Sequence, residues 1–318
     1  MEETLAGDLS FTGRVALVTG GGRGIGREYC RLLARRGCGV VVLGNYRESG
    51  AGPEADVVAE VIAAGGSAIA FNGSVTESEV CDAAVAKAVE AFGRLDILVN
   101  CAGTSESTLL VEKGVSQAFD DQVAVHAKAW LRFFQAAVPH FEAAGGGRVL
   151  NFGSHVSLGW RAPNGWGSAY AFAKAGAYGL TRQMAGFGAE RNINVNLMMP
   201  MCHTDMVGDG NDFARWWKEN LPAANIAIAG LYLLHESSPV SGEFISAAGG
   251  RVSRIVLASH DGLFDVDLTP EKVRDQWSKV MGPSAGDLQL GPGWYETPGQ
   301  PCEYATIQRL HNEAKARV

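Results

Sequence analysis

The sequence lacks the features that would place it in a membrane, on nucleic acid or around a metal. No apolar run approaches the ~18 residues needed to cross a bilayer. Lys and Arg number 27 against 34 Asp and Glu, a net charge of −7 that leaves no basic excess for a phosphate backbone. The His, Asp and Glu residues show no metal-ligand spacing. We therefore expect no membrane, nucleic-acid or metal partner.

Cysteines are also few, and the 6 of them form no C-x-x-C pair. Cys30, Cys38 and Cys101 fall in segments typical of a buried α/β core, so we expect free thiols with a structural role. Residues 1–10 are acidic and lack the basic start and apolar run of a signal peptide. The expected location is the cytoplasm.

Short apolar runs alternate with longer segments of helical periodicity along most of the chain. The expected strands are 15–19, 40–43, 68–71, 97–100, 148–153 and 194–198, and the expected helices are 26–36, 57–64, 80–92, 119–143 and 170–191. This alternation predicts β-α-β units and an α/β fold with a parallel sheet. With 318 residues, 47% of them hydrophobic, the chain is long enough to bury a full apolar core.

The composition changes near Gly249-Gly250. Beyond this point we expect a strand over 254–258, a helix with Thr269 as N-cap and Pro270 in its first turn, and a Gly/Pro-rich stretch. So short a segment with so much Pro and Gly could hardly bury a core alone. The sequence therefore predicts a single domain with a C-terminal extension that packs on its own or a neighbouring subunit, with these bounds: 1–252 and 253–318.

A glycine-rich turn follows the first expected strand and opens the first expected helix. It consists of Thr19, Gly20, Gly21, Gly22, Arg23, Gly24, Ile25 and Gly26. Gly20 permits a tight turn, Gly24 lets the backbone approach a pyrophosphate at the helix N-terminus, and Gly26 lets helix and strand pack closely. Because the run stands between a strand and a helix, it predicts a dinucleotide site rather than a tight turn without a ligand.

Tyr170 and Lys174 stand four residues apart on the helix expected over 170–191, so their side chains share one face. A nearby ammonium and a cationic nicotinamide ring would lower the pKa of the phenol and allow proton exchange with a substrate hydroxyl. Alone, such a pair is more typical of an ordinary amphipathic helix. Its interpretation depends on the other motifs.

Five motifs occur in the order found in the short-chain dehydrogenase/reductase family, which the sequence resembles over residues 11–250. They are T-G-x-x-x-G-x-G at 19–26, Asn100-Cys101-Ala102-Gly103 where the family has N-N-A-G, Ser154, Tyr170 with Lys174, and Pro200 to Thr204. The resemblance implies a Rossmann-type, doubly wound parallel sheet. It also implies a nicotinamide-dependent oxidoreductase that interconverts a ketone and a secondary alcohol.

The resemblance also implies roles for individual residues. Tyr170 would be the general acid/base, Ser154 would hold the reacting oxygen, and Lys174 would bind the nicotinamide ribose and lower the pKa of the tyrosine. Further cofactor-binding candidates are Gly20, Gly22, Arg23, Gly24, Ile25, Gly26, Asn45, Ser74, Val75, Asn100, Ala102, Gly103, Pro200 and Thr204.

The choice of serine is open between two positions. Ser157 stands at the family's usual distance from Tyr170, whereas alignment of the strand expected over 148–153 selects Ser154. We favour Ser154, because the residues just before Tyr170 already match the family spacing. The extra residues then fall around 160–163.

His126 stands where most members of the family carry a catalytic asparagine. The same histidine occurs in the dehydrogenase domains of peroxisomal multifunctional enzymes, a subgroup that the chain resembles also in its long connection after the second strand. His126 would keep a relay water in place. The alternative is a buried histidine hydrogen-bonded to the backbone.

The acidic residue that grips the ribose diol in many relatives is missing at the end of the second strand, which reads Leu43-Gly44-Asn45. Arg23, and Arg47 further on, could pair with a 2′-phosphate. We therefore favour NADP(H), and NAD(H) is the alternative. Ser74, where many members have an aspartate, does not decide between them.

The sequence indicates the type of reaction more clearly than the identity of the substrate. Phe213, Trp216 and Trp217, with Trp160, Trp166, Trp294 and Tyr295, could line an apolar pocket or belong to the core. We expect a small apolar substrate such as a keto/hydroxyacyl, polyketide or steroid-like compound. The alternatives are a non-oxidative step such as dehydration or cyclisation, and a non-catalytic cofactor-binding regulator.

The resemblance further implies a homo-oligomer, a dimer or a tetramer. Relatives pair two long helices between subunits, and these correspond here to 119–143 and 170–191.

Overall fold

The computed structural model describes residues 8–46, 52–158, 167–207, 212–255, 263, 265, 268–281 and 312, apart from the side chain of Phe213. Contacts divide the chain into one unit over Met1–Arg254 and a second over Ile255–Val318. The first unit carries every residue proposed above for the site. The expectation that 253–318 packs on a subunit stays a prediction.

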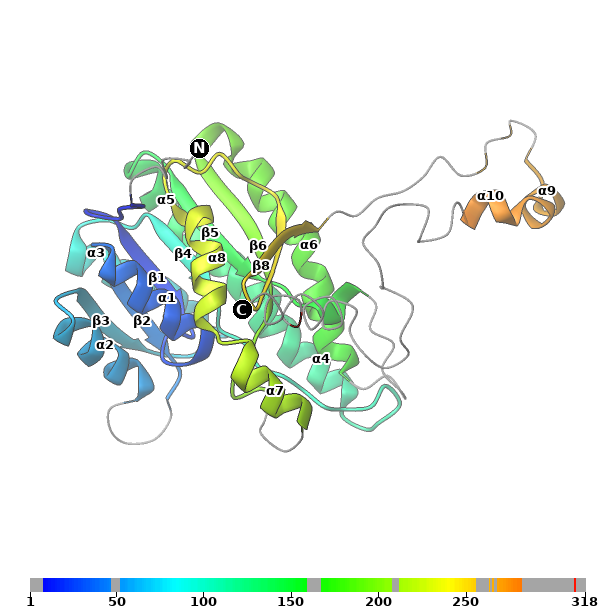
Figure 1. The fold of residues 1–318 in the computed structure, drawn as a ribbon. Coiled ribbons are helices and arrows are strands. Elements are labelled where there is room, and N and C mark those ends of the chain that lie inside the picture. The colour runs from blue at the N-terminus through cyan, green and yellow to red at the C-terminus, as the bar shows by residue number, and fades with distance from the viewer. Residues whose placement is uncertain are drawn as a thin grey trace. The chain divides into compact units, whose positions relative to one another are not determined.

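Within these residues an eight-stranded sheet has the order β3-β2-β1-β4-β5-β6-β7-β8 (Figure 1). The strands are β1 Val15–Thr19, β2 Gly39–Gly44, β3 Ser67–Asn72, β4 Ile97–Asn100, β5 Gly147–Phe152, β6 Ile193–Met201, β7 Phe244–Ala248 and β8 Arg251–Ile255. Neighbouring strands from β3 through to β7 pair in parallel. The predicted Rossmann-type, doubly wound sheet is confirmed.

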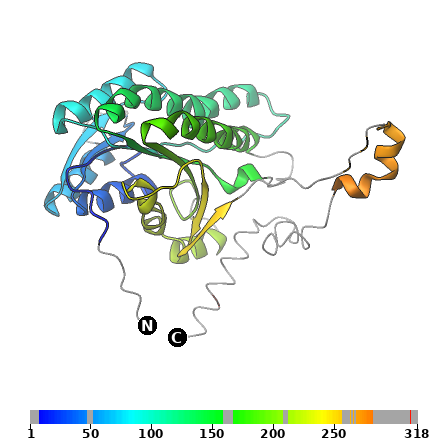
Figure 2. The same ribbon diagram turned by 90° about the horizontal axis from the view of Figure 1, so that it is seen from above.

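Helices cover both faces of this sheet, with α1, α2 and α8 on one side and α3, α5 and α6 on the other (Figures 1 and 2). The α-helices are α1 Gly24–Arg35, α2 Pro53–Ala63, α3 Ser78–Phe92, α4 Val115–Val123, α5 Ala129–Ala143, α6 Ser168–Gly188, α7 Asp212–Asn220, α8 Ala224–Leu234, α9 Pro270–Asp275 and α10 Trp277–Met281. A π-helix, η1 Ala124–Lys128, joins α4 to α5, and short 3-10 turns cover His155–Leu158 and Ala189–Arg191. Because both faces are covered, β1 and β4 are buried along their whole length, as in parallel sheets generally.

Several predicted boundaries differ from the structure. α2 begins at Pro53 rather than at residue 57, since Pro is well tolerated in the first turn of a helix. The single helix expected over 119–143 is interrupted by the π-helix. β6 runs on to Met201, so Pro200 lies inside the strand rather than after it, and β8 begins at Arg251 and ends at Ile255.

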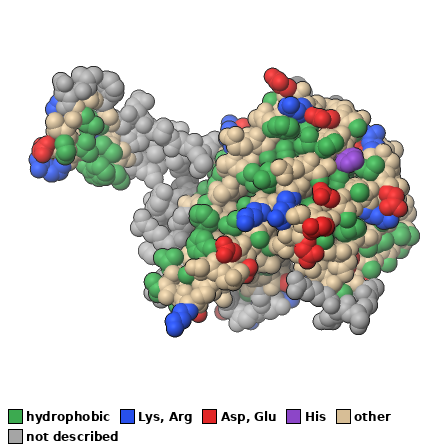
Figure 3. Space-filling view, turned by 180° about the vertical axis from the view of Figure 1, so that it is seen from behind, with side chains coloured by type: hydrophobic (Ala, Val, Ile, Leu, Met, Phe, Trp, Pro, Cys, Tyr) green, Lys and Arg blue, Asp and Glu red, His purple; other side chains and the backbone are tan. Residues whose placement is uncertain are grey.

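In the second unit, α9 begins as predicted, because the side chain of Thr269 accepts a hydrogen bond from the backbone N–H of Lys272. The five cysteines in the described part of the chain, Cys30, Cys38, Cys81, Cys101 and Cys202, are free. None of the described helices is long and apolar enough to cross a membrane. The described surface seen in Figure 3 carries acidic and basic side chains scattered among apolar ones, rather than a basic stripe.

Candidate active site

The turn between β1 and α1 leaves no room for side chains. Gly20 and Gly24 have φ of +66° and +47°, in the left-handed region that favours glycine. A Cβ on Gly26 would lie 2.2 Å from the carbonyl oxygen of Gly20. The side chain of the N-cap residue Arg23 makes no capping hydrogen bond. The first backbone N–H groups of α1 are thus left to receive an anion such as a pyrophosphate.

Two further loops converge on the glycine turn from the carboxyl ends of β4 and β6. A Cβ on Gly20 would lie 2.8 Å from Cα of Ala102, and one on Gly24 would lie 3.3 Å from Cγ2 of Thr204. The backbone N–H of Ala102 donates to Oγ1 of Thr19 at 3.0 Å, which fixes the loop after β4. The loops after β4 and β6 thus lie against the glycine turn, and these three segments together form a cradle whose tightest contacts are at glycines.

Asn100 lies at the end of β4, next to this cradle. The side chain is fully buried, and its Nδ2 donates to Oδ1 of Asn151 at 2.8 Å. Its own Oδ1 has no hydrogen-bond partner among the described residues. A buried acceptor without a donor is rare in a protein, so this oxygen fits a donor from a bound group. The cradle and this oxygen together fit a dinucleotide.

The remaining cofactor candidates lie at the same carboxyl edge of the sheet. Gly103 packs on His126, because a Cβ there would lie 2.8 Å from Cε1 of that ring. Ser74 and Val75 are buried after β3, and Asn45 is exposed after β2. Gly22 and Ile25 belong to the glycine turn itself. Arg47 lies outside the described residues.

Tyr170, Ser154 and Lys174 come together at the carboxyl end of β5. The side chain of Ser154 lies close enough to Tyr170 to lower the pKa of its phenol. Nζ of Lys174 is buried beneath them, 5.6 Å from the centre of the Tyr170 ring and 5.3 Å from the centre of the Trp130 ring. It donates to the carbonyl oxygen of Phe152 at 2.6 Å. The structure therefore brings together the hydroxyl, phenol and amine that the motifs select.

Burial shifts the two titrating groups in opposite directions. It raises the pKa of Tyr170, an effect that the side chain of Ser154 partly offsets. It lowers the pKa of Lys174 from 10.5 to about 7. The sequence predicted a phenol made more acidic by its ammonium neighbour. In this structure desolvation is the larger effect, because a four-residue spacing gives proximity but not burial.

The second serine has a different partner. Oγ of Ser157 donates to the carbonyl oxygen of Ser154 at 2.5 Å and lies 2.8 Å from the hydroxyl of Tyr178. Tyr178 is buried and faces Met199 and Phe244 rather than Tyr170. Ser157 is thus held in a core contact, one turn of helix beyond Ser154.

His126 lies in the π-helix, a feature that often occurs at functional sites. Its ring packs edge-on against Tyr170, with 5.4 Å between ring centres. Burial first, and the charge of Lys174 second, lower its pKa well below the ordinary value, so the ring is neutral. The carbonyl oxygen of Thr104 accepts from Nε2 at 2.9 Å, and Nδ1 is then an acceptor without a partner among the described residues.

Sequence reasoning missed Glu106, which holds the N-terminus of α6. Its Oε1 accepts from the backbone N–H groups of Ala169 and Tyr170 at 3.1 and 3.2 Å. Its Oε2 accepts from the backbone N–H of Thr108 at 2.7 Å and from the hydroxyl of the same residue. The N-cap position itself is Gly167, which has no side chain to cap the helix. No local pattern reveals such a cap, because the carboxylate comes from a loop more than sixty residues earlier.

Sequence reasoning also missed Glu54 in the first turn of α2. This carboxylate is buried beside Gly44 at the end of β2. A glutamate after Pro53 is typical of an ordinary helix start, so its sequence context did not distinguish it.

The predicted aromatic pocket is only partly described. Trp216 and Trp217 lie on α7 and are half-buried. The other aromatic side chains predicted for this pocket lie outside the described residues. They are Trp160, Trp166, Trp294, Tyr295 and the side chain of Phe213.

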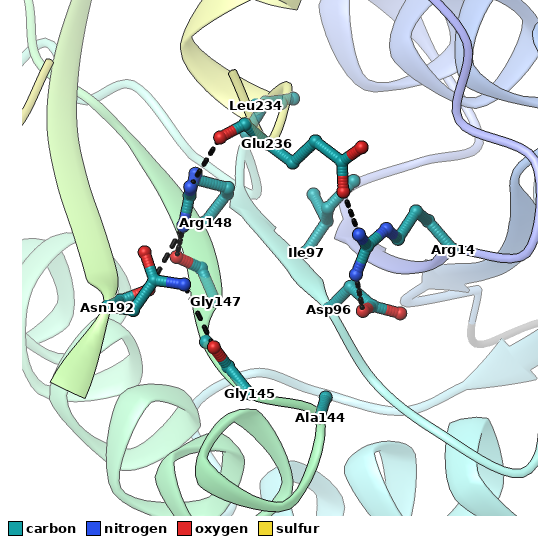
Figure 4. Close-up of a pocket in the computed structure, with 11 residues that line it drawn as sticks. Arg14, Asp96, Ile97, Ala144, Gly145, Gly147, Arg148, Asn192, Leu234 and Glu236 are labelled. Carbon is teal, nitrogen blue, oxygen red and sulfur yellow. Dashed lines mark hydrogen bonds and ion pairs between the residues drawn. The ribbon is translucent and has the colours of Figure 1, made fainter. Parts of the chain in front are cut away.

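A polar pocket at the opposite, amino edge of the sheet has a structural role (Figure 4). Arg14 donates to Oδ1 of Asp96 at 3.1 Å and pairs with Glu236. Arg148 donates to three backbone carbonyl oxygens at 2.9 to 3.0 Å. These charges are already satisfied, and ligands of such sheets bind at the carboxyl ends of the strands.

Comparison with known proteins agrees with this geometry. The family model described as "short chain dehydrogenase" matches residues 14–214. The peroxisomal multifunctional enzyme type 2 of Drosophila melanogaster is 35% identical over 286 residues, which cover 86% of this chain and 46% of that protein. The chain thus spans less than half the length of this relative.

Two solved structures share the fold. A short chain dehydrogenase from Mycobacterium avium is 28% identical with a TM-score of 0.73, covering 85% of this chain and 95% of its own. A 7α-hydroxysteroid dehydrogenase complexed with NADH and 7-oxo glycochenodeoxycholic acid is also 28% identical, with a TM-score of 0.68, and covers 76% of this chain and 95% of its own.

Proposed function

We propose that this chain, which belongs to the short-chain dehydrogenase/reductase family, is an NAD(P)-dependent oxidoreductase that interconverts a ketone and a secondary alcohol on an apolar substrate. Membership of the family implies NAD(H) or NADP(H) as cofactor and a small-molecule substrate. The observation that carries the proposal is the grouping of Ser154 and Tyr170 with the buried amine of Lys174, whose Nζ lies 5.6 Å from the centre of the Tyr170 ring. These groups stand at the same edge of the sheet as the glycine cradle.

In the reductive direction, the hydroxyl of Tyr170 donates its proton to the oxygen of the substrate. Ser154 donates a second hydrogen bond to that oxygen and holds it as negative charge develops. A nicotinamide held in the cradle would supply the hydride to the carbonyl carbon in reduction and accept it from the alcohol carbon in oxidation. In the oxidative direction, Tyr170 takes the proton back from the alcohol.

Lys174 and His126 lie behind Tyr170 and act through it. The amine of Lys174 would hold a ribose hydroxyl of the cofactor, and its pKa of about 7 lets it exchange a proton near neutral pH. His126 is a positioning residue, because its neutral ring supports Tyr170 edge-on. Its free Nδ1 accepts a hydrogen bond from a relay water.

The residues that would hold the cofactor are those of the cradle. The backbone of Gly20 to Gly26 would receive the pyrophosphate, and Asn100, Gly103 and Thr204 would line the cradle. The acceptor Oδ1 of Asn100 supports this proposal, because it is buried without a donor.

The substrate class follows from the relatives rather than from a described pocket. One relative is named a peroxisomal multifunctional enzyme and another a hydroxysteroid dehydrogenase. We favour a keto/hydroxyacyl compound, with polyketide and steroid-like ketones as the other apolar classes.

A homo-oligomer, dimer or tetramer, is part of the proposal. Leu131 on α5 and Phe172 and Phe187 on α6 are 42%, 59% and 45% exposed, and apolar side chains on these helices support a subunit contact. Sedimentation at 33.6 kDa would contradict it. The expected cytoplasmic location stays a prediction, since the relatives include peroxisomal enzymes.

The proposed reaction is tested by following nicotinamide absorbance with a panel of ketones that includes keto-acyl thioesters. We expect oxidation of the reduced cofactor by wild type and its loss in Tyr170→Phe, with cofactor binding retained. The matched control is Tyr178→Phe, which removes a hydroxyl from the same helix but away from Ser154. Turnover of a ketone without any change in absorbance would instead indicate a non-oxidative step.

A further inference from the structure

Glu54 places a carboxylate at the end of β2, where the sequence shows no acidic residue. It is the second residue of α2 and is 4% exposed. A Cβ built on Gly44, the last residue of β2, would lie 2.3 Å from Oε2 of Glu54. The carboxylate therefore occupies the space that a side chain at position 44 would fill.

The same carboxylate lies beside a second glycine, and the backbone of Glu54 lies beside a third. A Cβ on Gly52 would lie 2.5 Å from its Oε1, and a Cβ on Gly22, in the glycine turn, would lie 2.9 Å from the backbone nitrogen of Glu54. The first turn of α2 thus packs directly on the cradle. Neither Gly44 nor Gly52 could carry a side chain without displacing the acid.

No described residue donates a hydrogen bond or forms an ion pair with the Glu54 carboxylate. Burying a carboxylate is costly unless a donor or a cation accompanies it. The N-terminus of α2 offsets part of this cost. Because no described residue donates to this carboxylate, which lies beside the last residue of β2, its oxygens are left to accept a hydrogen bond from a ligand.

We propose that Glu54 accepts the hydrogen bond of the adenosine ribose 2′-hydroxyl and thereby selects NAD(H) over NADP(H). This inference rests on the proposed function, because it requires a nicotinamide dinucleotide in the cradle. In dinucleotide-binding sheets an acid near the end of the second strand binds the ribose diol, and it repels a 2′-phosphate. Here α2 supplies that acid in place of β2.

Two of the described basic side chains near the turn are already paired with another acid. Arg27 and Arg31 on α1 both pair with Glu60. Arg23 is exposed. The sequence-based preference for NADP(H) rested on the absence of an acid at the end of β2, whereas Glu54 of α2 places a carboxylate beside Gly44. The cofactor preference that follows is the reverse.

The test uses ligands that differ in one group. AMP and adenosine 2′,5′-bisphosphate differ by the 2′-phosphate, and NADH and NADPH differ in the same way. Their dissociation constants are measured by isothermal titration calorimetry on the full chain. The variant is Glu54→Gln, which keeps the size and removes the charge. The control is Asp56→Asn, which removes a charge from the same helical turn at an exposed position.

We expect wild type to bind AMP and NADH about tenfold or more tightly than their 2′-phosphorylated counterparts. Glu54→Gln should reduce this ratio by about tenfold, whereas Asp56→Asn should leave it unchanged. Equal or tighter binding of the phosphorylated ligands by wild type would overturn the proposal, and so would an unchanged ratio in Glu54→Gln. Failure of wild type to bind any of the four ligands would instead overturn the proposed function.

Discussion

The buried amine of Lys174 makes the stability of the protein depend on pH in a way that one substitution should remove. The residue is 4% exposed, and burial lowers the pKa of its amine from 10.5 to about 7. At about 1.4 kcal/mol per pH unit, this fall corresponds to about 5 kcal/mol for burying the charged form.

Whether stability rises or falls with pH depends on how many protons Lys174 binds in the folded and in the unfolded protein. Below pH 7 the lysine is protonated both folded and unfolded, and the full penalty opposes folding. As the pH rises from 7 toward 10.5, only the unfolded lysine stays protonated, so the penalty shrinks and stability rises. Lys174→Met removes this dependence. It also removes the hydrogen bond to the carbonyl oxygen of Phe152, at a cost of about 1 to 3 kcal/mol.

We therefore expect Lys174→Met to be more stable than wild type at pH 7 by about 2 kcal/mol and to lose this advantage near pH 9.5. Between these values the free energy of unfolding of wild type should rise relative to the variant by about 3 kcal/mol. Urea denaturation across this range, without cofactor, measures both. Lys128→Met, at an exposed lysine, is the control and should show no such trend. A difference between wild type and Lys174→Met that stays constant with pH would refute the reasoning.

Three further substitutions test the site. Gly26→Ala would press a Cβ against the carbonyl oxygen of Gly20, so it should cost about 2 kcal/mol or more in urea denaturation and weaken NADH binding. Ser154→Ala should lower kcat by about 100-fold or more, while Ser157→Ala, which loses only a contact in the core, should stay within a few-fold in steady-state kinetics. Glu106→Ala leaves two N–H groups of α6 without their acceptor and should lower stability to urea by about 1 to 2 kcal/mol; an unchanged midpoint would contradict this role.

The sheet could be predicted from sequence because its strands are short, apolar and buried on both faces. β4 was predicted to the residue, and β1 likewise, since continuous apolar runs bounded by polar turns leave little freedom. The glycine turn could also be predicted, because its glycines lie within one short segment of the sequence. The limits of α2 and β6 were not predicted: α2 begins four residues earlier than expected, at Pro53, and β6 continues three residues further, through Pro200 to Met201.

The grouping of Ser154, Tyr170 and Lys174 could be predicted, but their ionisation could not. Spacing along a helix fixes which side chains are neighbours. It does not fix how much water reaches them, and desolvation decides both pKa shifts in this structure. The π-helix that presents His126 was also invisible, because one long amphipathic pattern runs through it.

Two carboxylates outside every motif, Glu54 and Glu106, show why the family pattern predicts the reaction better than its selectivity. Each comes from an element outside the family motifs. Glu106 accepts hydrogen bonds at the N-terminus of α6, which carries Tyr170, and Glu54 is the residue that we propose to contact the ribose. The repulsion of a 2′-phosphate depends on where a negative charge lies and how well it is shielded from water. It does not depend on which strand or helix carries that charge. An acid that moves from the end of β2 to the first turn of α2 therefore preserves the electrostatics while erasing the sequence signal. For this reason the cofactor preference has to be argued from the space around Gly44 rather than from the residues that follow it.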